Sequence, residues 1–405
     1  MTKAISVVVP VLALGAILLV GCENDTTPSL FDPNATSRPA PVVSDVQPAG
    51  NAFAGIGVLT ISGQNFSAVK EENFVFFDDV LGEVMQASAT QLQVKAPVLV
   101  KDGIKLRISV FKAEQFSNTI TYDLVAAVSD LVKPTEFDVP WAVTCDALGN
   151  VYASYVVNNS GPSSGIKRIA PDGSVSDYSP EPSGAPLRYN SMKVGPGGAI
   201  YGTTNERRIS QVPPAGGAPS NWVIIQNTSV KVYDLDFDKE GNLWAAGNNT
   251  DIYRIKQDKS VTSFAFTADV RSVRIYNDHV YLGGGRTGAE KVWRLPILSA
   301  DAVGPEEEYF DLSSKYTGAI QAITFAADGD LYLGTDGPES IVVVHSDKSS
   351  EPLYPGLFQS ACLSFAWDPD IHLYVTQQAE GTVLQSILKV NMQKNGAPYY
   401  GRGDL

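Results

Sequence analysis

The sequence predicts an all-β protein, and three observations lead to that prediction. The 405 residues include 35 glycines and 25 prolines, a composition that indicates many tight turns. Between residues 41 and 124, short apolar stretches alternate with polar residues at the period of two that strands require, and no helical period appears. After residue 126, a block of two strands joined by a polar turn recurs six times, so the larger domain is expected to be a repeat protein.

The first 21 residues have the pattern of a secretion signal. Lys3 precedes an apolar run over residues 5–20, which is too short and too weakly flanked for a membrane span. The run ends in Leu19-Val20-Gly21-Cys22, which resembles the lipobox of bacterial lipoproteins. That resemblance implies cleavage before Cys22 and a diacylglycerol group on its thiol. We therefore expect a lipid-anchored protein of the cell envelope, at the outer membrane, on its surface or its periplasmic side.

Residues 22–40 are expected to form a flexible tether. This stretch is rich in Pro, Ser, Asn and Thr and has too little apolar content to pack. The net charge of the chain is −14 at pH 7. Such an acidic surface repels phosphate backbones and anionic lipid, so nucleic acid is excluded as a partner and the lipid chain is expected to provide the membrane attachment.

Residues 41–124 are expected to form a sandwich of short strands. Seven strand-like segments in about 85 residues is the size of an immunoglobulin-like domain. The chain resembles the IPT/TIG domain in the stretches Leu59-Thr60-Ile61-Ser62-Gly63-Gln64-Asn65-Phe66, Val75-Phe76-Phe77 and Ser88-Ala89-Thr90-Gln91-Leu92-Gln93-Val94, and in the closing Asn118 and Tyr122. This resemblance implies an immunoglobulin-like spacer or docking module and implies no chemistry.

Residues 127–405 carry the sixfold repeat. An aromatic residue opens the second strand of each copy, and these residues lie about 40 to 50 positions apart, which is the length of a propeller blade. They are Tyr152, Tyr201, Trp244, Tyr281, Tyr332 and Tyr374. The pattern resembles the NHL-repeat propellers and the wider six-bladed group that includes gluconolactonase-type enzymes. The sequence thus predicts an immunoglobulin-like sandwich followed by a six-bladed β-propeller.

Two segments are candidates for the outer strand that completes the last blade. Asn395-Gly396 is a hairpin signal, so residues 397–402 are expected to supply that strand. The alternative is that residues 128–133 supply it and latch the ring.

The two cysteines of the repeat domain are expected to remain unbonded. The repeat places Cys145 and Cys362 on first strands of neighbouring blades but about five residues apart in level. At ~3.3 Å per residue they are ~16 Å apart, beyond the ~7 Å limit for a disulfide.

Polar residues follow the second strand of successive repeats, and all are expected on one face of the ring. They are Asn159, Asn205, Asn249, Arg286, Asp336 and Gln378. Amide groups both donate and accept hydrogen bonds, which suits sugar hydroxyls or a peptide backbone. Four aromatic residues could add stacking surfaces, namely Trp141, Tyr155, Tyr189 and Tyr233. The alternative is that Asn, Asp and Gly stand here only because tight turns require them.

The sequence contains no Cys-x-x-Cys, His-Glu-x-x-His, Gly-x-Ser-x-Gly or Walker-type motif, so we predict no catalytic residue, no metal site and no cofactor. His279, His345 and His372 are expected to be loop residues. The resemblance to gluconolactonase-type propellers raises one alternative, a divalent cation in the channel held by Glu136 or Asp138 with Asn205 and Asp336. The first strand of the repeat lacks the Glu-Gly-Pro pattern of those enzymes, which weakens this alternative.

The sequence therefore predicts a non-catalytic envelope lipoprotein. Its propeller face is expected to bind a glycan or an envelope protein, with the sandwich domain as a stalk. The alternative function is an envelope hydrolase or lyase that uses a cation in the propeller channel.

Overall fold

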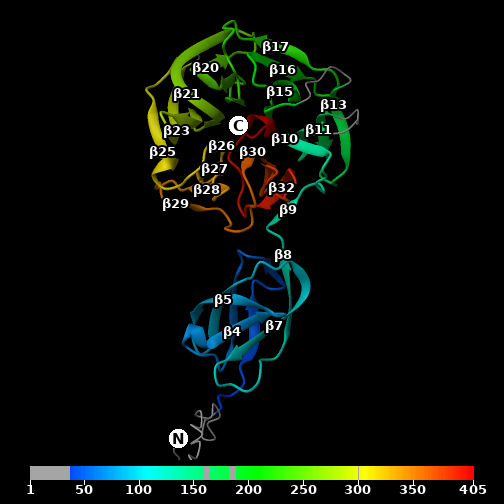
Figure 1. Ribbon diagram of the computed structural model, residues 1–405, viewed down its shortest axis with the longest axis vertical. Helices are drawn as coiled ribbons and strands as arrows, with labels where there is room; N and C mark the ends of the chain where they lie inside the picture. The colour runs from blue at the N-terminus through cyan, green and yellow to red at the C-terminus, as the bar shows by residue number, and fades with distance from the viewer. Residues whose placement is uncertain (1–36, 158–163, 182–187, 300) are drawn as a thin grey trace, which may run out of the picture.

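The structure is a computed structural model that describes residues 37–157, 164–181, 188–299 and 301–405. Within these ranges the regular structure is β, apart from single 3₁₀ turns. No helix there is long and apolar enough to cross a membrane. A smaller sandwich domain and a larger ring of sheets lie end to end (Figure 1). The prediction of an all-β protein is confirmed.

Eight strands build the sandwich domain in the hydrogen-bonded order β1-β3-β6-β5-β4-β7-β8-β2. They are β1 (Val42–Gln47), β2 (Asn51–Phe53), β3 (Val58–Gln64), β4 (Asn73–Phe77), β5 (Val80–Ala87), β6 (Gln91–Lys95), β7 (Lys101–Val110) and β8 (Ile120–Val125). Strand β5 pairs with β4 and with β6 and so joins the two sheets. The sequence predicted seven strands in this domain and did not predict β2, which pairs in parallel with β8.

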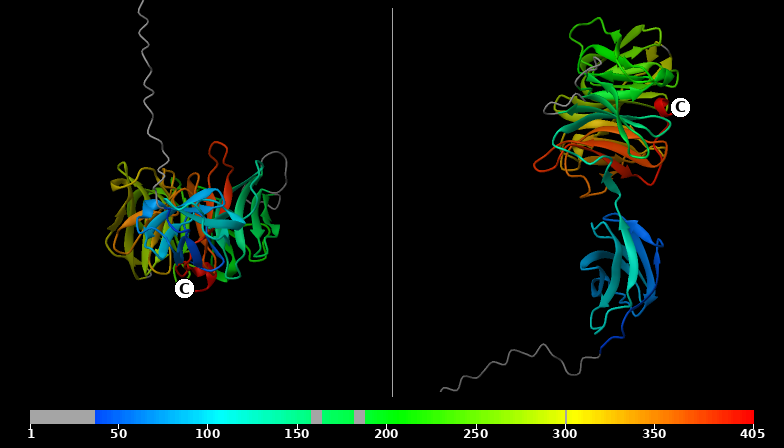
Figure 2. Two further views of the ribbon diagram at one scale, coloured as in Figure 1. Left: turned by 90° about the horizontal axis from the view of Figure 1, so that it is seen from below. Right: turned by 90° about the vertical axis from the view of Figure 1, so that its right-hand side faces the viewer.

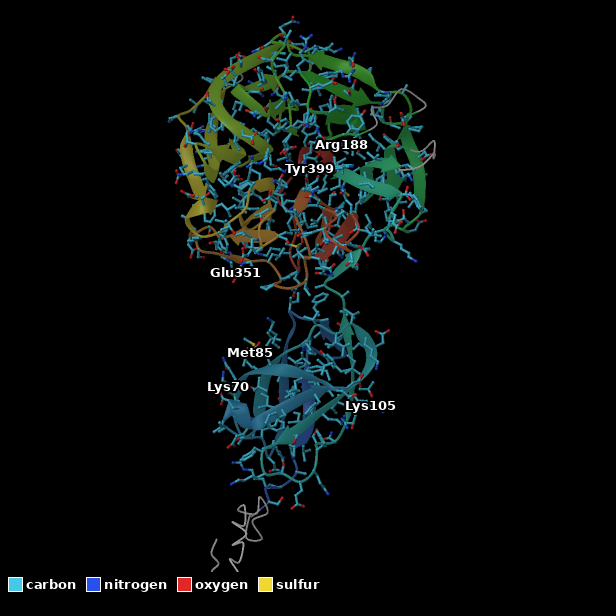
Figure 3. The ribbon with its side chains drawn as sticks, in the orientation of Figure 1. Lys70, Met85, Lys105, Arg188, Glu351 and Tyr399 are labelled. Atoms are coloured by element: carbon cyan, nitrogen blue, oxygen red, sulfur yellow. The ribbon has the colours of Figure 1, made fainter. Side chains whose placement is uncertain are left out.

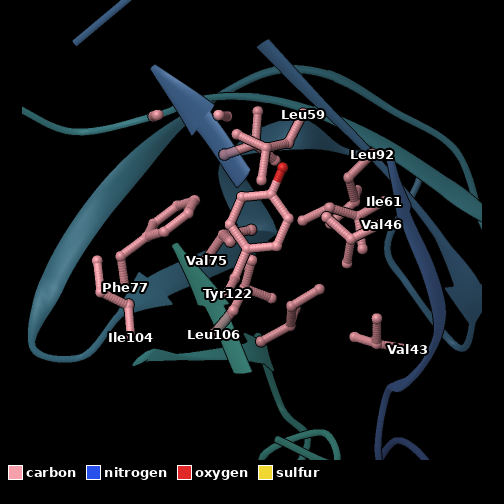
Figure 4. Packing of buried hydrophobic residues seen from close by; sticks show 14 of the residues in the cluster. Val43, Val46, Leu59, Ile61, Val75, Phe77, Leu92, Ile104, Leu106 and Tyr122 are labelled. Atoms are coloured by element: carbon pink, nitrogen blue, oxygen red, sulfur yellow. The ribbon is translucent and has the colours of Figure 1, made fainter. Parts of the chain in front are cut away.

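Alternate residues of these strands form the sandwich core (Figure 4). Leu59 and Ile61 on β3 and Val75 and Phe77 on β4 are fully buried. Each buried side chain of this kind stabilises the fold by about 1.5–3 kcal/mol relative to an exposed one. The Tyr122 hydroxyl donates to the Pro48 carbonyl at 2.6 Å, which ties the last long strand to the turn after the first.

The ring contains four sheets of four strands and one of eight. The first two are β10 (Asp138–Cys145), β11 (Val151–Val157), β12 (Gly165–Ile169) and β13 (Val175–Pro180), and β14 (Ser191–Val194), β15 (Ile200–Thr203), β16 (Arg208–Val212) and β17 (Ser220–Ile224). The eight-stranded sheet has β18 (Asp234–Phe237), β19 (Leu243–Ala246), β20 (Asn248–Ile255), β21 (Val261–Tyr276), β22 (His279–Arg286), β23 (Ala289–Ser299), β24 (Ala302–Val303) and β25 (Glu307–Asp311). The last two are β26 (Ile320–Phe325), β27 (Leu331–Thr335), β28 (Ile341–Val344) and β29 (Ser350–Pro352), and β30 (Cys362–Trp367), β31 (His372–Gln377), β32 (Ser386–Asn391) and β9 (Val128–Asp130).

These sheets have a propeller-like arrangement around a central channel. The strands β10, β14, β18, β21, β26 and β30 contact one another in cyclic order, so they close the ring at its axis. Strand β21 is long because residues 261–269 pair with β20 and residues 269–276 pair with β22. Each of the six repeated blocks forms the hairpin between one of these first strands and the next strand.

The turn of the repeated block is held by its aspartate. In β18–β19, the Asp238 carboxylate accepts from the backbone amides of Glu240 and Asn242 at 3.1 and 2.8 Å. It also accepts from the Trp244 indole at 3.0 Å. Asp146 serves the β10–β11 turn in the same way and accepts from the Tyr152 hydroxyl at 3.0 Å. In these two turns the aspartate and the aromatic residue of the repeat are therefore hydrogen-bond partners, which fixes the spacing between them.

The last sheet is completed from the N-terminal side of the ring. Strand β9 pairs with β32, with Ser129 opposite Lys389, and the Leu131 amide donates to the Ile387 carbonyl at 2.7 Å. The expectation that residues 397–402 form this strand is therefore wrong, and the alternative latch is correct. Residues 395–397 instead run beside the end of β26, where the Ala397 amide donates to the Phe325 carbonyl at 2.9 Å. The chain after them turns under the channel, and the C-terminus lies at one face of the ring (Figure 2).

Cys145 and Cys362 are both free and buried, as predicted. Cys145 pairs at the hairpin end of β10, whereas Cys362 is the first residue of β30. The two thiols are thus at opposite levels of adjacent first strands.

The latch predicts a sharp contrast between two neighbouring proline substitutions. Leu131→Pro removes the amide donor to Ile387 and part of the side-chain packing on the core, so the ring should lose roughly 2–4 kcal/mol of stability. Asp130→Pro is the matched control, because antiparallel pairs alternate and Leu131 is the hydrogen-bonded position, so the Asp130 amide points away from β32. Denaturant unfolding of both variants measures the difference. Equal stability of the two variants would show that β9 does not hold the ring closed.

Candidate functional site

The channel mouth is built from one residue within or directly before each first strand. In each hairpin, one residue of the first strand pairs with the position just before the repeat aromatic, and the mouth residue lies four positions before that first-strand residue. We call this set the mouth layer: Trp141, Asn190, Tyr233, Arg271, Gln321 and Leu363. All six are partly exposed, whereas five of the six residues that follow them are buried. The polar surface of the channel is therefore concentrated at this level.

Five of the mouth residues line one small cavity on the ring axis. Its volume is about 20 Å³, and Lys193 and Arg274 form its deeper wall. A cavity of this size has room for one or two waters, since each needs about 10–15 Å³. The channel therefore narrows directly below the mouth layer, and a larger ligand would have to lie across the mouth.

Two of the mouth side chains are already engaged. The Arg271 guanidinium pairs with Asp269 and Glu290 and donates to the Ile320 carbonyl at 2.6 Å. The Gln321 amide donates to Asp336 at 3.0 Å. Such contacts hold these groups in fixed positions around the opening.

The other polar mouth side chains are available to a ligand. The Asn190 side-chain amide and the Tyr233 hydroxyl make no hydrogen bond with any residue in the described ranges, whereas the Asn190 backbone amide donates to the Thr203 carbonyl at 2.8 Å. The Arg188 guanidinium lies over the Trp141 ring at 4.0 Å from its centroid, a cation–π contact. Figure 3 places Arg188 close to the centre of the ring. The opening thus offers an amide, a phenol, an indole and a guanidinium.

A buried aspartate ties three first strands together below the mouth. Asp234 on β18 accepts from Ser191 on β14, from Ser272 on β21 at 2.8 Å, and from Arg274 on β21 at 3.1 Å. The backbone amide of Val273 on β21 also donates to the Asp234 carboxylate, at 2.8 Å. Burial opposes ionisation of Asp234, but the charges of Arg274 and Lys193 and these hydrogen bonds outweigh it and lower its pKa. Asp234 is therefore a satisfied carboxylate that fixes the channel wall.

Two of the predicted ligand-binding residues support the mouth from behind. The Asn249 amide accepts from the Lys231 backbone amide at 3.0 Å and donates to the Lys231 carbonyl at 2.9 Å. A Cβ on Gly247 would meet that carbonyl at 1.8 Å, so the loop can approach only a glycine. Asp336 accepts from the Ala319 amide at 2.6 Å, in addition to Gln321. Such contacts are expected if Asn249 and Asp336 serve to hold tight turns, which was the alternative to a ligand-binding role.

The remaining predicted residues lie apart from the opening or are less constrained. Arg286 stacks on Phe266 and Trp293 at 4.5 Å each and forms an ion pair with Glu306. Asn205 is exposed with a φ of 63°, and the Gln378 side chain is exposed. Asn159 and the lipidation residue Cys22 lie outside the described residues. A ligand-binding role for this set remains a prediction.

Two of the residues proposed for a channel cation, Asp138 and Asp336, have other partners. The Asp138 carboxylate accepts from Thr135 and Lys167, and Glu136 is exposed. Within the described ranges, no three His, Cys, Asp or Glu side chains gather to hold a metal ion. Each histidine has a neighbouring partner, because His279 contacts the Asn277 carbonyl, His345 contacts Asp330 and His372 contacts Asp368.

Sequence reasoning missed most of the mouth layer. Trp141 and Tyr233 were expected as stacking surfaces, and both lie at the opening, whereas Tyr155 and Tyr189 are buried. Asn190, Arg271, Gln321 and Leu363 were not singled out. The signal that would have found them is their constant position four residues before the first-strand residue that pairs with the position preceding the repeat aromatic.

Comparisons with known proteins agree with this architecture. Residues 41–124 match the IPT/TIG domain. The sandwich is an IPT/TIG domain, as its sequence predicted. No curated protein matches the chain.

Solved structures resemble the chain over most of its length. A structural genomics protein of unknown function from Bacteroides thetaiotaomicron is 16% identical with a TM-score of 0.52, covering 89% of this chain and 99% of that one. The luciferin-regenerating enzyme is 15% identical with a TM-score of 0.51, covering 67% and 97%. An auxiliary nutrient binding protein from Bacteroides thetaiotaomicron is 11% identical with a TM-score of 0.49, covering 89% and 98%. The first two likenesses show a shared fold and nothing about function.

The contacts of Asn249 predict a stability role that can be measured. Asn249→Ala removes two hydrogen bonds to the Lys231 backbone, so the variant should lose about 1–2 kcal/mol of unfolding free energy. Gln378→Ala is the control, and should change stability by less than about 0.5 kcal/mol. Thermal or denaturant unfolding compares them. An Asn249→Ala protein of unchanged stability would return Asn249 to the ligand-binding set.

Proposed function

We propose that the protein is a non-catalytic binding protein of the cell envelope, and that its ligand is a glycan held across the channel mouth. The observation that carries this proposal is the mouth layer. Trp141 and Tyr233 present aromatic surface, while the Asn190 side-chain amide and the Tyr233 hydroxyl are without protein partners in the described ranges. Groups that donate and accept hydrogen bonds beside aromatic rings suit a polyhydroxylated ligand.

The width of the channel supports binding at the surface of the ring. Ligand pockets for drug-sized molecules have volumes of about 300–1,000 Å³, and the cavity below the mouth has about 20 Å³. A sugar ring cannot pass this constriction. The ligand would therefore contact the mouth layer and the loops around it.

The proposal includes a six-bladed ring. The eight-stranded sheet is counted as two blades that share β21, because each half of β21 pairs with different strands. The cyclic contacts of six first strands support this count. Each blade then contributes one residue to the mouth layer.

The proposal also includes a lipid anchor at the outer membrane. Residues 1–21 would be the signal peptide, Cys22 the lipidated residue and residues 22–40 the tether. The IPT/TIG domain would act as a stalk. Only Ala126 and Ala127 separate β8 of this domain from the latch strand β9, so the ring is joined to the stalk without a long linker.

The mouth layer predicts which substitutions abolish binding. A glycan array probed with the fragment from residue 41 identifies a ligand, and calorimetry then measures its affinity. Trp141→Ala combined with Tyr233→Ala should weaken binding by about tenfold or more, because aromatic contacts carry much of the energy of such sites. Phe111→Ala on the IPT/TIG domain is the control, since this aromatic residue is 52% exposed and far from the ring axis.

Three outcomes decide the proposal. Loss of affinity at unchanged melting temperature supports it. Full affinity in the double variant overturns the mouth site. Capture of one envelope protein that needs the same two residues, without binding of any arrayed glycan, would favour a protein ligand.

The anchor is tested by Cys22→Ser. This variant should appear as a soluble protein or as an uncleaved precursor, since it has no thiol to receive the lipid. Membrane fractionation with immunodetection measures the distribution, and wild-type protein is the control. Processed variant that remains in the membrane fraction would contradict the lipid anchor.

A further inference from the structure

A second cavity lies deeper in the channel, and it is lined by charged groups that the mouth does not use. Its volume is about 40 Å³, and its wall includes Lys193 of β14, Asp236 of β18 and Arg274 of β21. These side chains are 5%, 2% and 8% exposed. Lys193 and Arg274 also line the mouth cavity, so they stand between the two.

Lys193 differs from the other buried cations. Arg254, Arg274 and Arg402 each lie within 4 Å of a carboxylate, from Asp238, Asp234 and Asp404 respectively. The Lys193 ammonium forms no ion pair and no hydrogen bond with any residue in the described ranges, although it lies 5.7 Å from the centroid of the Tyr399 ring. Burial, with the charge of Arg274, lowers its pKa to about 8. A buried ammonium without a hydrogen-bonding partner is energetically unfavourable.

Asp236 lacks a hydrogen-bond donor for one of its carboxylate oxygens. One carboxylate oxygen accepts from the Ile275 amide at 2.9 Å, but Oδ1 is buried without a hydrogen-bond partner among the described groups. Burial raises the pKa of this carboxyl. The neighbouring Asp234, in contrast, has all its oxygens engaged. The cavity is thus lined by one carboxylate, of Asp236, with an oxygen that lacks a hydrogen-bond donor. It is also lined by two cationic side chains, Lys193 and Arg274, that have unused N–H groups.

The far end of the cavity is closed by the C-terminal segment. Pro398 and Tyr399 line it, and the Tyr399 hydroxyl donates to the Val194 carbonyl at 3.1 Å. Figure 3 shows Tyr399 near the ring centre. Arg402 anchors this segment by donating to the Asp368 carbonyl at 2.8 Å. A Cβ on Gly396 would meet Trp367 at 2.3 Å, so the segment also depends on a glycine for its close approach.

The size and the donors of the cavity define its ligand. A volume of about 40 Å³ is room for roughly three waters or one small polyatomic ion. The ion must accept from Lys193 and Arg274, and it must donate to Asp236 Oδ1. Bicarbonate has both properties, because it is a planar anion of four non-hydrogen atoms that keeps one O–H group.

We propose that this cavity is a binding site for a small oxyanion that carries an O–H group, with bicarbonate as its type. The oxyanion oxygens accept from the Lys193 ammonium and the Arg274 guanidinium, and the hydroxyl donates to Asp236. Lys193 and Arg274 line both this cavity and the mouth cavity. This site is independent of the glycan proposal.

The experiment compares bicarbonate with nitrate, which has the same planar shape and charge but no hydrogen. The melting temperature of the full chain is measured at neutral pH and constant ionic strength, with chloride as the background ion. Bicarbonate should raise it by roughly 5 °C at about a hundred times the dissociation constant. Nitrate should give a smaller rise. No difference between bicarbonate, nitrate and chloride overturns the proposal and leaves water as the occupant.

Two variants of the cavity and one control variant outside it locate the effect of bicarbonate on the melting temperature. Lys193→Met should abolish the bicarbonate-dependent rise, and Lys231→Met, which removes an exposed lysine of the same ring, should keep it. Asp236→Asn places an N–H where an acceptor stood, so this variant should prefer nitrate to bicarbonate. A bicarbonate effect that persists in Lys193→Met, or an unchanged preference in Asp236→Asn, overturns the site. Asp236→Asn keeps the proposal testable if Lys193→Met does not fold.

Discussion

Closure of the ring by β9 is the constraint on which the rest of the structure depends. A four-stranded sheet cannot bury both faces alone, so each sheet of the ring is stable only between two neighbours. The last sheet obtains its outer strand from the segment that precedes the first sheet, and the two ends of the ring are held together by backbone hydrogen bonds. Because β9 follows β8 after two residues, the same closure attaches the IPT/TIG domain to the ring.

Closure also determines what the axis can contain. Six first strands meet there, and their polar residues are brought into layers that no single sheet could form. Asp234 joins β14, β18 and β21 through buried hydrogen bonds and so holds the layers in register. The mouth layer above Asp234 remains partly exposed. The cavity below it is lined by Lys193 and, at its far end, by the C-terminal segment. One channel therefore provides two chemically different environments.

Sequence patterns predicted the structure best where the signal was local and repeated. In the β10–β11 and β18–β19 turns the aspartate and the aromatic residue are hydrogen-bond partners, so their spacing was visible in the chain. Sequence patterns were less successful at the last sheet, where the Asn395-Gly396 signal favoured a hairpin that the structure does not use. The outer edge of β32 is filled by a strand far away in sequence, and local turn preference says nothing about that competition. The residues chosen for ligand binding followed the second strands, and Asn249 and Asp336 prove to be bound to neighbouring loops.

The sequence by itself determined the all-β class, the IPT/TIG domain, the repeated hairpins and the absence of a bond between Cys145 and Cys362. These features depend on period, turn chemistry and level within a repeat, all of which are read along the chain. Only the tertiary structure decided which strand closes the ring, which residues form the mouth layer and that Lys193 and Asp236 share a cavity. The physical reason is that these groups come from different sheets. Their meeting is set by packing around the axis, which has no counterpart in any local stretch of sequence.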